Sequence, residues 1–201
     1  MPHVTCNMSV SVDGFVAGPR QSTANPIGDG GIRLHEWHFD PQGDDQRIID
    51  EWQTSPGAYI MGRNMFGPGR GAWDPAWTGW WGDEPDYHAP VFVLTHHARE
   101  SLTMQGGTTF HFVTAGIESA LEQAKAAAGD RNVEIAGGAS TVNAYLAAGA
   151  IDELHLHIAP MLLGAGERLF DGVPADLQLA PIAVSGSPGA THVKYRVGRA
   201  E

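Results

Sequence analysis

The stretch EIAGGASTVNAYLAAG, residues 134–149, decides how this chain is expected to fold. Its first residues form a short apolar run typical of a buried strand, and its second half has the composition of a helix. Gly137 and Gly138 lie between the two, so the pattern predicts a strand, a tight turn and a helix. Backbone amides at the start of a helix favour a bound phosphate, and glycines let the phosphate approach closely. A plain turn that caps a helix gives the same pattern, so the glycine pair alone leaves both interpretations open.

Composition and charge restrict the class of protein. The 201 residues, 42% of them hydrophobic and 17% charged, are predicted to form a single domain, residues 1–201. A formal net charge of -11 opposes nucleic-acid binding, although a few arginines and backbone amides could still hold one small anion. No apolar run is long enough for a membrane span. The lone Cys6 rules out an internal disulfide and favours the cytoplasm.

Predicted strands and helices alternate along most of the chain, and the last strands follow one another directly. This order indicates an α/β fold with a mostly parallel sheet, an antiparallel C-terminal edge and helices on both faces. Segments 17–43 and 66–90 are rich in Gly and Pro and are predicted to be loops. The expected strands are 3–12, 57–62, 90–95, 109–113, 132–136, 151–160, 176–184 and 190–197, and the expected helices are 44–52, 117–128 and 140–148.

Two further strand ends carry side chains suited to a nucleotide. The run YIMGRN ends a predicted buried strand at Gly62 and places Arg63 and Asn64 at the start of a short helix. A guanidinium makes paired hydrogen bonds to phosphate, but a surface arginine that caps a turn would look the same. Thr95 and His96 follow the strand PVFVLT, where they could hold ribose and phosphate or could be solvated loop residues.

Several patterns are rejected on their context. Gly67, Gly69 and Ala72 match the spacing of a dinucleotide fingerprint, but no strand precedes them and no helix follows. His155 and His157 share one face of a predicted strand without an evident third ligand, so no metal site is expected. Nucleophile signatures of hydrolases are absent.

In this order, the stretches SVDGFVAG, IMGRNMFG, VFVLTHHAR and IAGGASTVNAYLAAGAIDELHLHIAPMLLGAGERLF resemble the dihydrofolate reductase-like superfamily. Within it, the chain is similar to the reductase domain of riboflavin-biosynthesis deaminase/reductase proteins, from about residue 3 to 197. The resemblance implies a three-layer fold that holds NADPH across the carboxyl ends of its strands. It also implies a homodimer, because related reductases commonly pair.

The resemblance assigns site residues by position. LLGAGERLF matches a segment near the site, where Gly164 would allow a sharp bend, and Trp37 is one of several tryptophans that either line the substrate pocket or pack its loops. The cofactor would be held by Gly62, Arg63, Asn64, Thr95, His96, Gly137, Gly138, Ala139, Ser140 and Thr141.

Two carboxylates are candidates for assisting the reaction. Dihydrofolate reductases carry an acid on the helix before the MGR strand, and Asp45 is closest to that position, with Asp44 next. Such an acid can raise the electrophilicity of a hydride acceptor. Asp13 in SVDG matches a position close to the nicotinamide. Both have structural alternatives, Asp45 as a first-turn residue favoured by the helix dipole and Asp13 as a turn residue.

The sequence departs from the riboflavin-pathway pattern in two places. The acidic residue usual before the glycine pair is replaced by Ala136, and a chain with one cysteine cannot form the deaminase zinc site. The expected function is an NADPH-dependent reductase that transfers hydride to a pyrimidine- or pterin-like heterocycle. Dihydrofolate reductase activity, or NADPH binding without turnover, remains the alternative.

Overall fold

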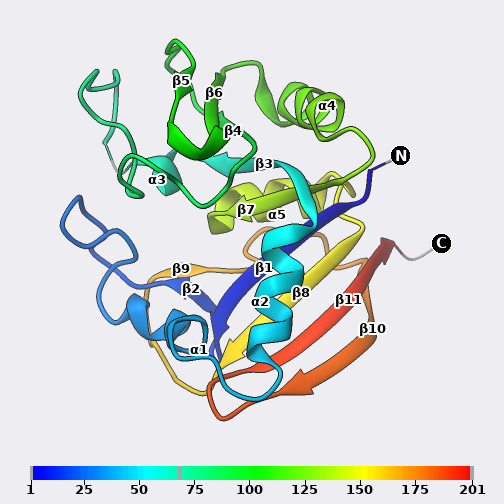
Figure 1. The fold of residues 1–201 in the computed structure, drawn as a ribbon. Helices are drawn as coiled ribbons and strands as arrows, with labels where there is room; N and C mark the ends of the chain where they lie inside the picture. The colour runs from blue at the N-terminus through cyan, green and yellow to red at the C-terminus, as the bar shows by residue number, and fades with distance from the viewer. Residues whose placement is uncertain (1, 68, 200–201) are drawn as a thin grey trace.

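A computed structural model of the protein describes residues 2–67 and 69–199, which build one nine-stranded sheet and a small second sheet (Figure 1). The order in the large sheet is β10-β11-β8-β1-β7-β3-β4-β6-β5. The strands from β8 to β6 run parallel, whereas β11 and β10 at one edge and β5 at the other are antiparallel. The strands are β1 (Val4–Ser11), β3 (Pro56–Gly62), β4 (Pro90–Leu94), β5 (Leu102–Thr103), β6 (Thr109–Val113), β7 (Asn132–Gly137), β8 (Glu153–Ala159), β10 (Leu177–Gly186) and β11 (Thr191–Arg199), and the small sheet pairs β2 (Phe15–Ala17) with β9 (Glu167–Arg168).

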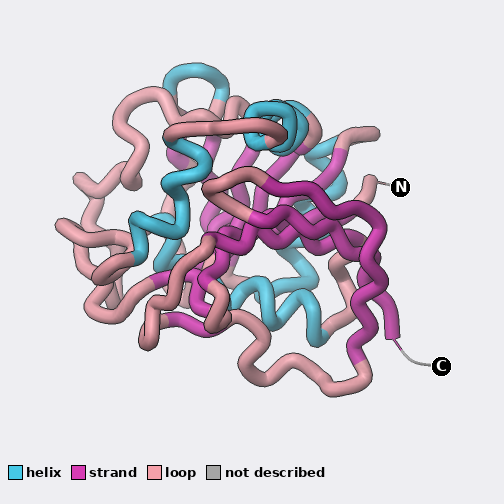
Figure 2. The backbone as a smooth tube through the Cα atoms, turned by 90° about the horizontal axis from the view of Figure 1, so that it is seen from below, coloured by secondary structure: helices cyan, strands magenta, loops and turns pink. Residues whose placement is uncertain are grey.

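Helices cover both faces of the large sheet (Figures 1 and 2). On one face lie α4 (Gly116–Ala128) and α5 (Ala139–Ala147), where Ala120, Ala124 and Ala128 of α4 are buried at four-residue spacing. Small side chains in that row let the helix approach the sheet closely. The other face carries α2 (Asp45–Thr54) and α3 (Arg63–Phe66), and Figure 1 shows α2 lying across β1 and β8. The predicted α/β class and the sheet topology are therefore confirmed.

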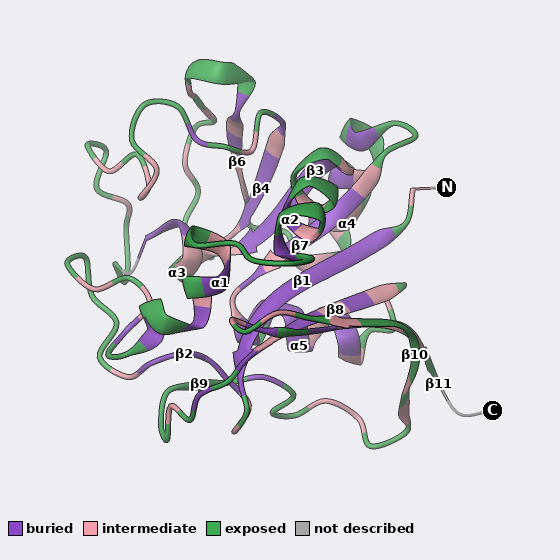
Figure 3. Ribbon diagram, turned by 60° about the horizontal axis from the view of Figure 1, so that its bottom comes forward, coloured by how far each residue is buried: buried purple, intermediate pink, exposed green. Residues whose placement is uncertain are grey.

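Strand β1 is buried along its whole length, as Figure 3 shows, but its two faces differ in chemistry. Successive side chains of a strand point to opposite faces. One face carries Val4, Cys6, Met8 and Val10, which join the main hydrophobic core under α5. The other face carries Thr5, Asn7, Ser9 and Ser11, and polar groups buried in this way need hydrogen-bond partners.

Every predicted strand and helix is present, with ends within about two residues of the predicted ones, the usual uncertainty of helix and strand ends. As predicted for the segment 66–90, residues 69–89 form a long loop packed on the sheet between α3 and β4, and residue 68 of the predicted loop lies outside the described residues. The prediction of a loop over 17–43 is wrong in part, because this segment contains η1 (Gly31–His35) and α1 (Glu36–Phe39). These short helices form because they bury Leu34 and Trp37 against the sheet.

Within the described ranges, no helix is long and apolar enough to cross a membrane.

A short 3-10 turn, η2 (Gln105–Gly107), joins β5 to β6 at the edge of the sheet.

Candidate functional site

A cavity of about 670 Å³ lies at the carboxyl ends of the parallel strands. In an open α/β sheet this edge is where ligands bind. Residues from β1, β3, β4, β6 and β7 line it, together with the first turn of α5 and parts of both long loops. The structure brings all of the predicted cofactor residues to this cavity: Gly62, Arg63, Asn64, Thr95, His96, Gly137, Gly138, Ala139, Ser140 and Thr141.

The glycine pair forms the junction between β7 and α5. Gly137 has a φ of 122°, a conformation that residues with a Cβ rarely adopt, and the peptide bond to Gly138 is cis. A Cβ placed on Gly138 would meet no atom within 4 Å, so this glycine leaves open space on the cavity wall. The first amides of a helix have no partner within the helix. The junction therefore offers the amides of Ala139 and Ser140, and the space to reach them, to an anion.

Arg63 lines the same cavity and is held in place by three contacts. Its Nε donates to the carbonyl oxygen of Gly69 at 2.9 Å, and its Nη1 donates to Thr95 Oγ1 at 3.3 Å. The guanidinium carbon lies 3.7 Å from the centre of the Trp73 ring, a cation–π contact. Arg70 lines the same cavity, so two guanidinium groups concentrate positive charge here in a chain with a net charge of -11. This end of the cavity fits phosphate groups.

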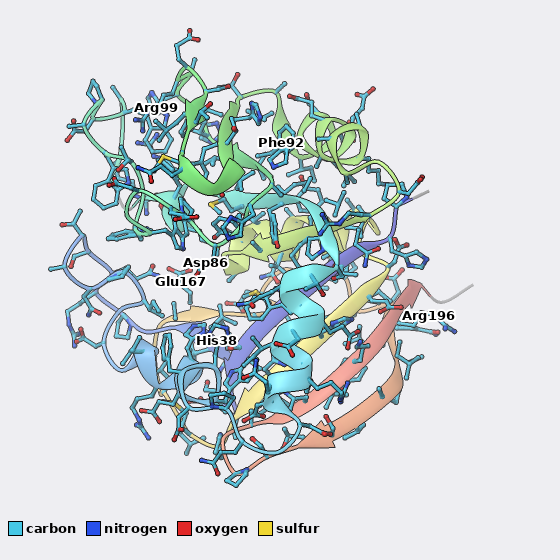
Figure 4. All side chains as sticks on the ribbon, in the orientation of Figure 1. His38, Asp86, Phe92, Arg99, Glu167 and Arg196 are labelled. Atoms are coloured by element: carbon cyan, nitrogen blue, oxygen red, sulfur yellow. The ribbon has the colours of Figure 1, made fainter. Side chains whose placement is uncertain are left out.

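The other end of the cavity is lined by β1, β2 and the helices that follow. His35 lies there, and burial together with the neighbouring His38 lowers its pKa to about 4, so it is neutral at pH 7. Glu167 of β9 lines the same region, and Figure 4 labels it on the side of the molecule where the N-terminal loop faces the loop that follows α3. Asn7, Ser9 and Trp52 complete this end with polar and aromatic groups.

Four predicted site residues do not line the cavity. Asp13 accepts hydrogen bonds from the amides of Leu163 and Gly164, at 3.0 and 2.7 Å. Hydrogen bonds from Ser11 and from these amides lower its pKa to about 2. Its carboxylate, with Gly164, therefore fixes the segment after β8. The catalytic role predicted for Asp13 and the substrate role predicted for Gly164 stay predictions.

The other two are buried and do not line the cavity. Trp37 is buried, and its Nε1 donates to Ser9 Oγ at 3.0 Å. Asp45 is fully buried at the start of α2, where it accepts a hydrogen bond from the amide of Gln42 at 2.9 Å and lies 2.8 Å from His192 Nε2. Direct contact between these side chains and a ligand in the cavity stays a prediction.

Asp45 begins a buried chain of hydrogen bonds, which we call the histidine network. His192 Nδ1 lies 2.9 Å from His157 Nδ1, and His157 Nε2 lies 3.2 Å from Asn7 Oδ1. Asn7 Nδ2 then donates to Glu134 Oε1 at 3.1 Å. The network thus runs from α2 through β11, β8 and β1 to β7, and it reaches the cavity wall at Asn7.

Glu134 closes the network in the middle of the sheet. Its carboxylate accepts hydrogen bonds from Thr5 Oγ1 at 2.5 Å and from the Asn7 amide at 2.7 Å. Burial raises the pKa of Glu134 to about 7, and these hydrogen bonds only partly offset the effect. Glu134 stands two residues before Ala136, so the two residues share a face of β7.

The sequence analysis did not identify Asn7, Glu134 or the two remaining network histidines as a unit. A signal was present in the strand patterns, because TCNMSVS and ELHLHIA place polar side chains at every second position on strands predicted to be buried. Nothing in one sequence shows that these strands are adjacent. Other residues of the cavity wall were also missed, among them Met8, Ser9, Val16, Ala17, His35, Trp52, Met65, Arg70, Leu94, Val113, Thr114, Gly116 and Ile117.

The sheet order and the cavity at its carboxyl edge define an α/β protein of the dihydrofolate reductase-like class. The family model of the RibD C-terminal domain matches residues 2–188. The chain therefore belongs to the RibD C-terminal domain family. The comparison with curated proteins found no match.

Solved structures show the same fold at low sequence identity. A Shewanella sp. PV-4 protein named for riboflavin biosynthesis is 21% identical, with a TM-score of 0.69, over 98% of this chain and 99% of the other. A pyrimidine reductase-like protein from Corynebacterium diphtheriae is 14% identical, with a TM-score of 0.59, over 99% and 93% of the two chains. A Thermotoga maritima diaminohydroxyphosphoribosylaminopyrimidine deaminase/5-amino-6-(5-phosphoribosylamino)uracil reductase is 15% identical, with a TM-score of 0.59, over 97% of this chain but only 56% of its own.

Proposed function

We propose that the protein is an NADPH-dependent reductase that transfers hydride to a small heterocycle of the aminouracil type. One observation carries the proposal: one cavity of about 670 Å³ brings together the glycine junction of α5, the Arg63–Thr95 pair and polar residues of β1. A dinucleotide needs anion contacts at one part of its site and a pocket for the substrate beside its reactive ring. Family membership supports the same conclusion.

The residues of the cavity fit the phosphates of the cofactor. The amides at the start of α5 and the hydroxyls of Ser140 and Thr141 would hold the pyrophosphate. Arg63, supported by its contacts with Thr95 and Trp73, would hold the phosphate on the adenosine ribose, and Arg70 would add charge there.

When bound, NADPH supplies the hydride, and the protein supplies orientation and electrostatics. The side chains at the β1 end would orient the acceptor and exclude water from it, with Trp52 as an apolar surface and Asn7 and Ser9 as hydrogen-bonding groups. His35 lies on this wall, and its imidazole is neutral at pH 7 because burial lowers its pKa to about 4. A neutral imidazole can donate a hydrogen bond from one ring nitrogen and accept one at the other.

The substrate class rests on the relatives. The names of two structural neighbours describe a pyrimidine reductase-like protein and a 5-amino-6-(5-phosphoribosylamino)uracil reductase. Trp80 and Trp81 line the cavity and offer aromatic surface to a planar ring. Folate reduction has less support, because the carboxylate of Asp45 is fully buried and bonded to His192.

The test is a titration of the purified protein with NADPH and NADH, followed by turnover assays with 5-amino-6-(5-phosphoribosylamino)uracil and dihydrofolate. We expect saturable binding of NADPH, weaker binding of NADH, and NADPH oxidation with the aminouracil. Binding without turnover on either substrate would indicate a nucleotide-binding protein that retains the fold. Absence of NADPH binding would overturn the proposal.

A further inference from the structure

Asn7 is the place where the histidine network meets the cavity. The residue is 7% exposed, lines the cavity and belongs to the polar face of β1. Its side-chain oxygen lies 3.2 Å from His157 Nε2 and 3.1 Å from His155 Nδ1. Its side-chain nitrogen faces the Glu134 carboxylate. Three neighbours on two strands, β7 and β8, therefore hold one carboxamide.

We propose that Asn7 selects the substrate, and that the histidine network fixes its carboxamide so that it presents an N–H donor, and no free acceptor, to the cavity. This inference rests on the proposed function and names the chemistry of its substrate. A ligand that binds against Asn7 must offer an acceptor at that point, such as a ring carbonyl oxygen or an unprotonated ring nitrogen.

The orientation of the carboxamide follows from its partners. Glu134 Oε1 also accepts the Asn7 backbone amide, so this oxygen is an acceptor, and a proton on Glu134 would lie on Oε2 beside the Thr5 hydroxyl. The nitrogen of the Asn7 side chain must therefore point to Glu134. Its oxygen then points to the histidines and has both lone pairs occupied. One of the two hydrogens on Nδ2 is bound to Glu134, and the second remains for a ligand.

The same reasoning assigns the protons of the histidine network to particular nitrogen atoms. Because Asn7 Oδ1 can only accept, His157 carries a proton on Nε2. Burial and the surrounding histidines hold the pKa of His157 well below its usual range, so its Nδ1 is an acceptor. His192 must then donate from Nδ1, and a further proton must lie between His192 Nε2 and Asp45 Oδ1. Asp45 thus acts on Asn7 through two histidines, as a positioning residue.

His155 repeats this arrangement on the exposed side of Asn7. With Nδ1 as the donor to Asn7 Oδ1, a further proton must lie between its Nε2 and Glu153 Oε2, which are 3.1 Å apart. Each histidine that fixes Asn7 therefore ends on a carboxylate, Asp45 for one and Glu153 for the other. Two independent supports explain why a single carboxamide can be held in one orientation.

The first experiment measures the network without cofactor or substrate. Long-range ¹H–¹⁵N NMR of the histidine side chains distinguishes a proton on Nε2 from one on Nδ1. We expect His157 to carry its proton on Nε2 and to lack one on Nδ1 at pH 7. A proton on Nδ1 of His157 would overturn the proposal, whether or not the protein is a reductase.

The second experiment changes the donor. Asn7→Asp replaces the N–H of the carboxamide by an oxygen of similar size. Asn132→Asp makes the same change at the amino end of β7, where Asn132 lines a smaller cavity of about 180 Å³ and not the large one. For an enzyme active on 5-amino-6-(5-phosphoribosylamino)uracil, Asn7→Asp should raise KM by about tenfold to a hundredfold. Its Kd for NADPH and the KM of Asn132→Asp should equal the wild-type values. An unchanged KM for Asn7→Asp would overturn the proposal.

The third experiment separates positioning from proton donation at Asp45. In Asp45→Asn the new amide can donate to His192 Nε2 and keep the order of donors, whereas Asp45→Leu cannot. We expect Asp45→Leu to raise KM by more than Asp45→Asn does, and Asp45→Asn to keep a measurable turnover with the aminouracil. The Asp45→Asn measurement can be interpreted on its own, so the positioning role is tested even if the Asp45→Leu protein does not fold. Loss of turnover in a folded Asp45→Asn protein would overturn the positioning role.

Discussion

Gly62 and Thr141 are in such close contact that a side chain on Gly62 would collide with the hydroxyl of Thr141. The contact joins the end of β3 to the first turn of α5, and both residues line the cavity. The absence of a Cβ at Gly62 therefore sets how closely the two main parts of the predicted cofactor site approach each other.

Replacing Gly62 by alanine should destabilise the protein by about 1–3 kcal/mol, because the new methyl group overpacks the junction. The added Thr141→Ala change removes the hydroxyl and should recover part of this loss. Chemical denaturation of the two single variants and the double variant gives the coupling energy between the positions. Additive effects would show that the contact does not limit the packing here.

Substitutions at the two glycines of the junction should affect folding differently. Gly137→Ala should cost about 1–2 kcal/mol of folding free energy, because the φ of 122° at this position is strained for any residue with a Cβ. Gly138→Val has room for its side chain and an ordinary φ of -73°, so it should fold normally.

The Gly138→Val side chain should instead occupy space that the phosphates need. We expect NADPH affinity to fall by about tenfold or more, measured by fluorescence titration on protein whose melting temperature is unchanged. Wild-type affinity in this variant would argue against a phosphate at the junction.

The guanidinium of Arg63 should contribute directly to cofactor affinity. Arg63→Met removes a charge that Thr95, Gly69 and Trp73 hold in place, and the Kd for NADPH should rise by about tenfold or more. Arg131→Met is the matched control, because Arg131 donates to the Thr54 carbonyl oxygen away from the cavity. The rise in Kd caused by Arg63→Met should be smaller for NADH, which lacks the ribose phosphate. Equal losses for both nucleotides would place Arg63 elsewhere on the cofactor.

Glu134 should make the folded state less stable as pH rises. Burial raises its pKa from an ordinary value of 4.5 to about 7, so between these values the folded protein holds a proton that the unfolded chain has released. The free energy of unfolding therefore falls as pH rises from about 4.5 to 7. The decrease that comes from Glu134 is on the order of 2–4 kcal/mol in total.

Glu134→Gln removes this titration, and the pH dependence of all other groups cancels in the comparison with wild type. The difference in unfolding free energy between variant and wild type, measured by urea denaturation at several pH values, should shift in favour of the variant between pH 5 and 8. Parallel curves over this range would contradict the raised pKa.

Much of the predicted cofactor site could be located from local sequence. Gly137 and Gly138 follow a short apolar run and precede a helix, and Arg63 follows a buried strand. Each motif therefore predicts the end of a strand to within a few residues. Parallel strands bring their carboxyl ends to one edge, and this explains why motifs far apart along the chain meet in one cavity.

The histidine network could not be predicted in the same way. Asp45 and His192 are 147 residues apart, and Asn7 and His157 are 150 apart, so their contacts depend on which strands are neighbours and in which register. Trp37 shows the same limit, because its position follows from the helix that buries it against β1.

The sequence by itself determined the alternation of strands and helices and the glycine-rich junction, because these depend on backbone preference and side-chain periodicity over a few residues. Only the tertiary structure decided that Asp45 faces His192 and that Asn7 reaches the cavity. The physical reason is that burial and hydrogen-bond partners come from strands that are adjacent in space and distant in the chain.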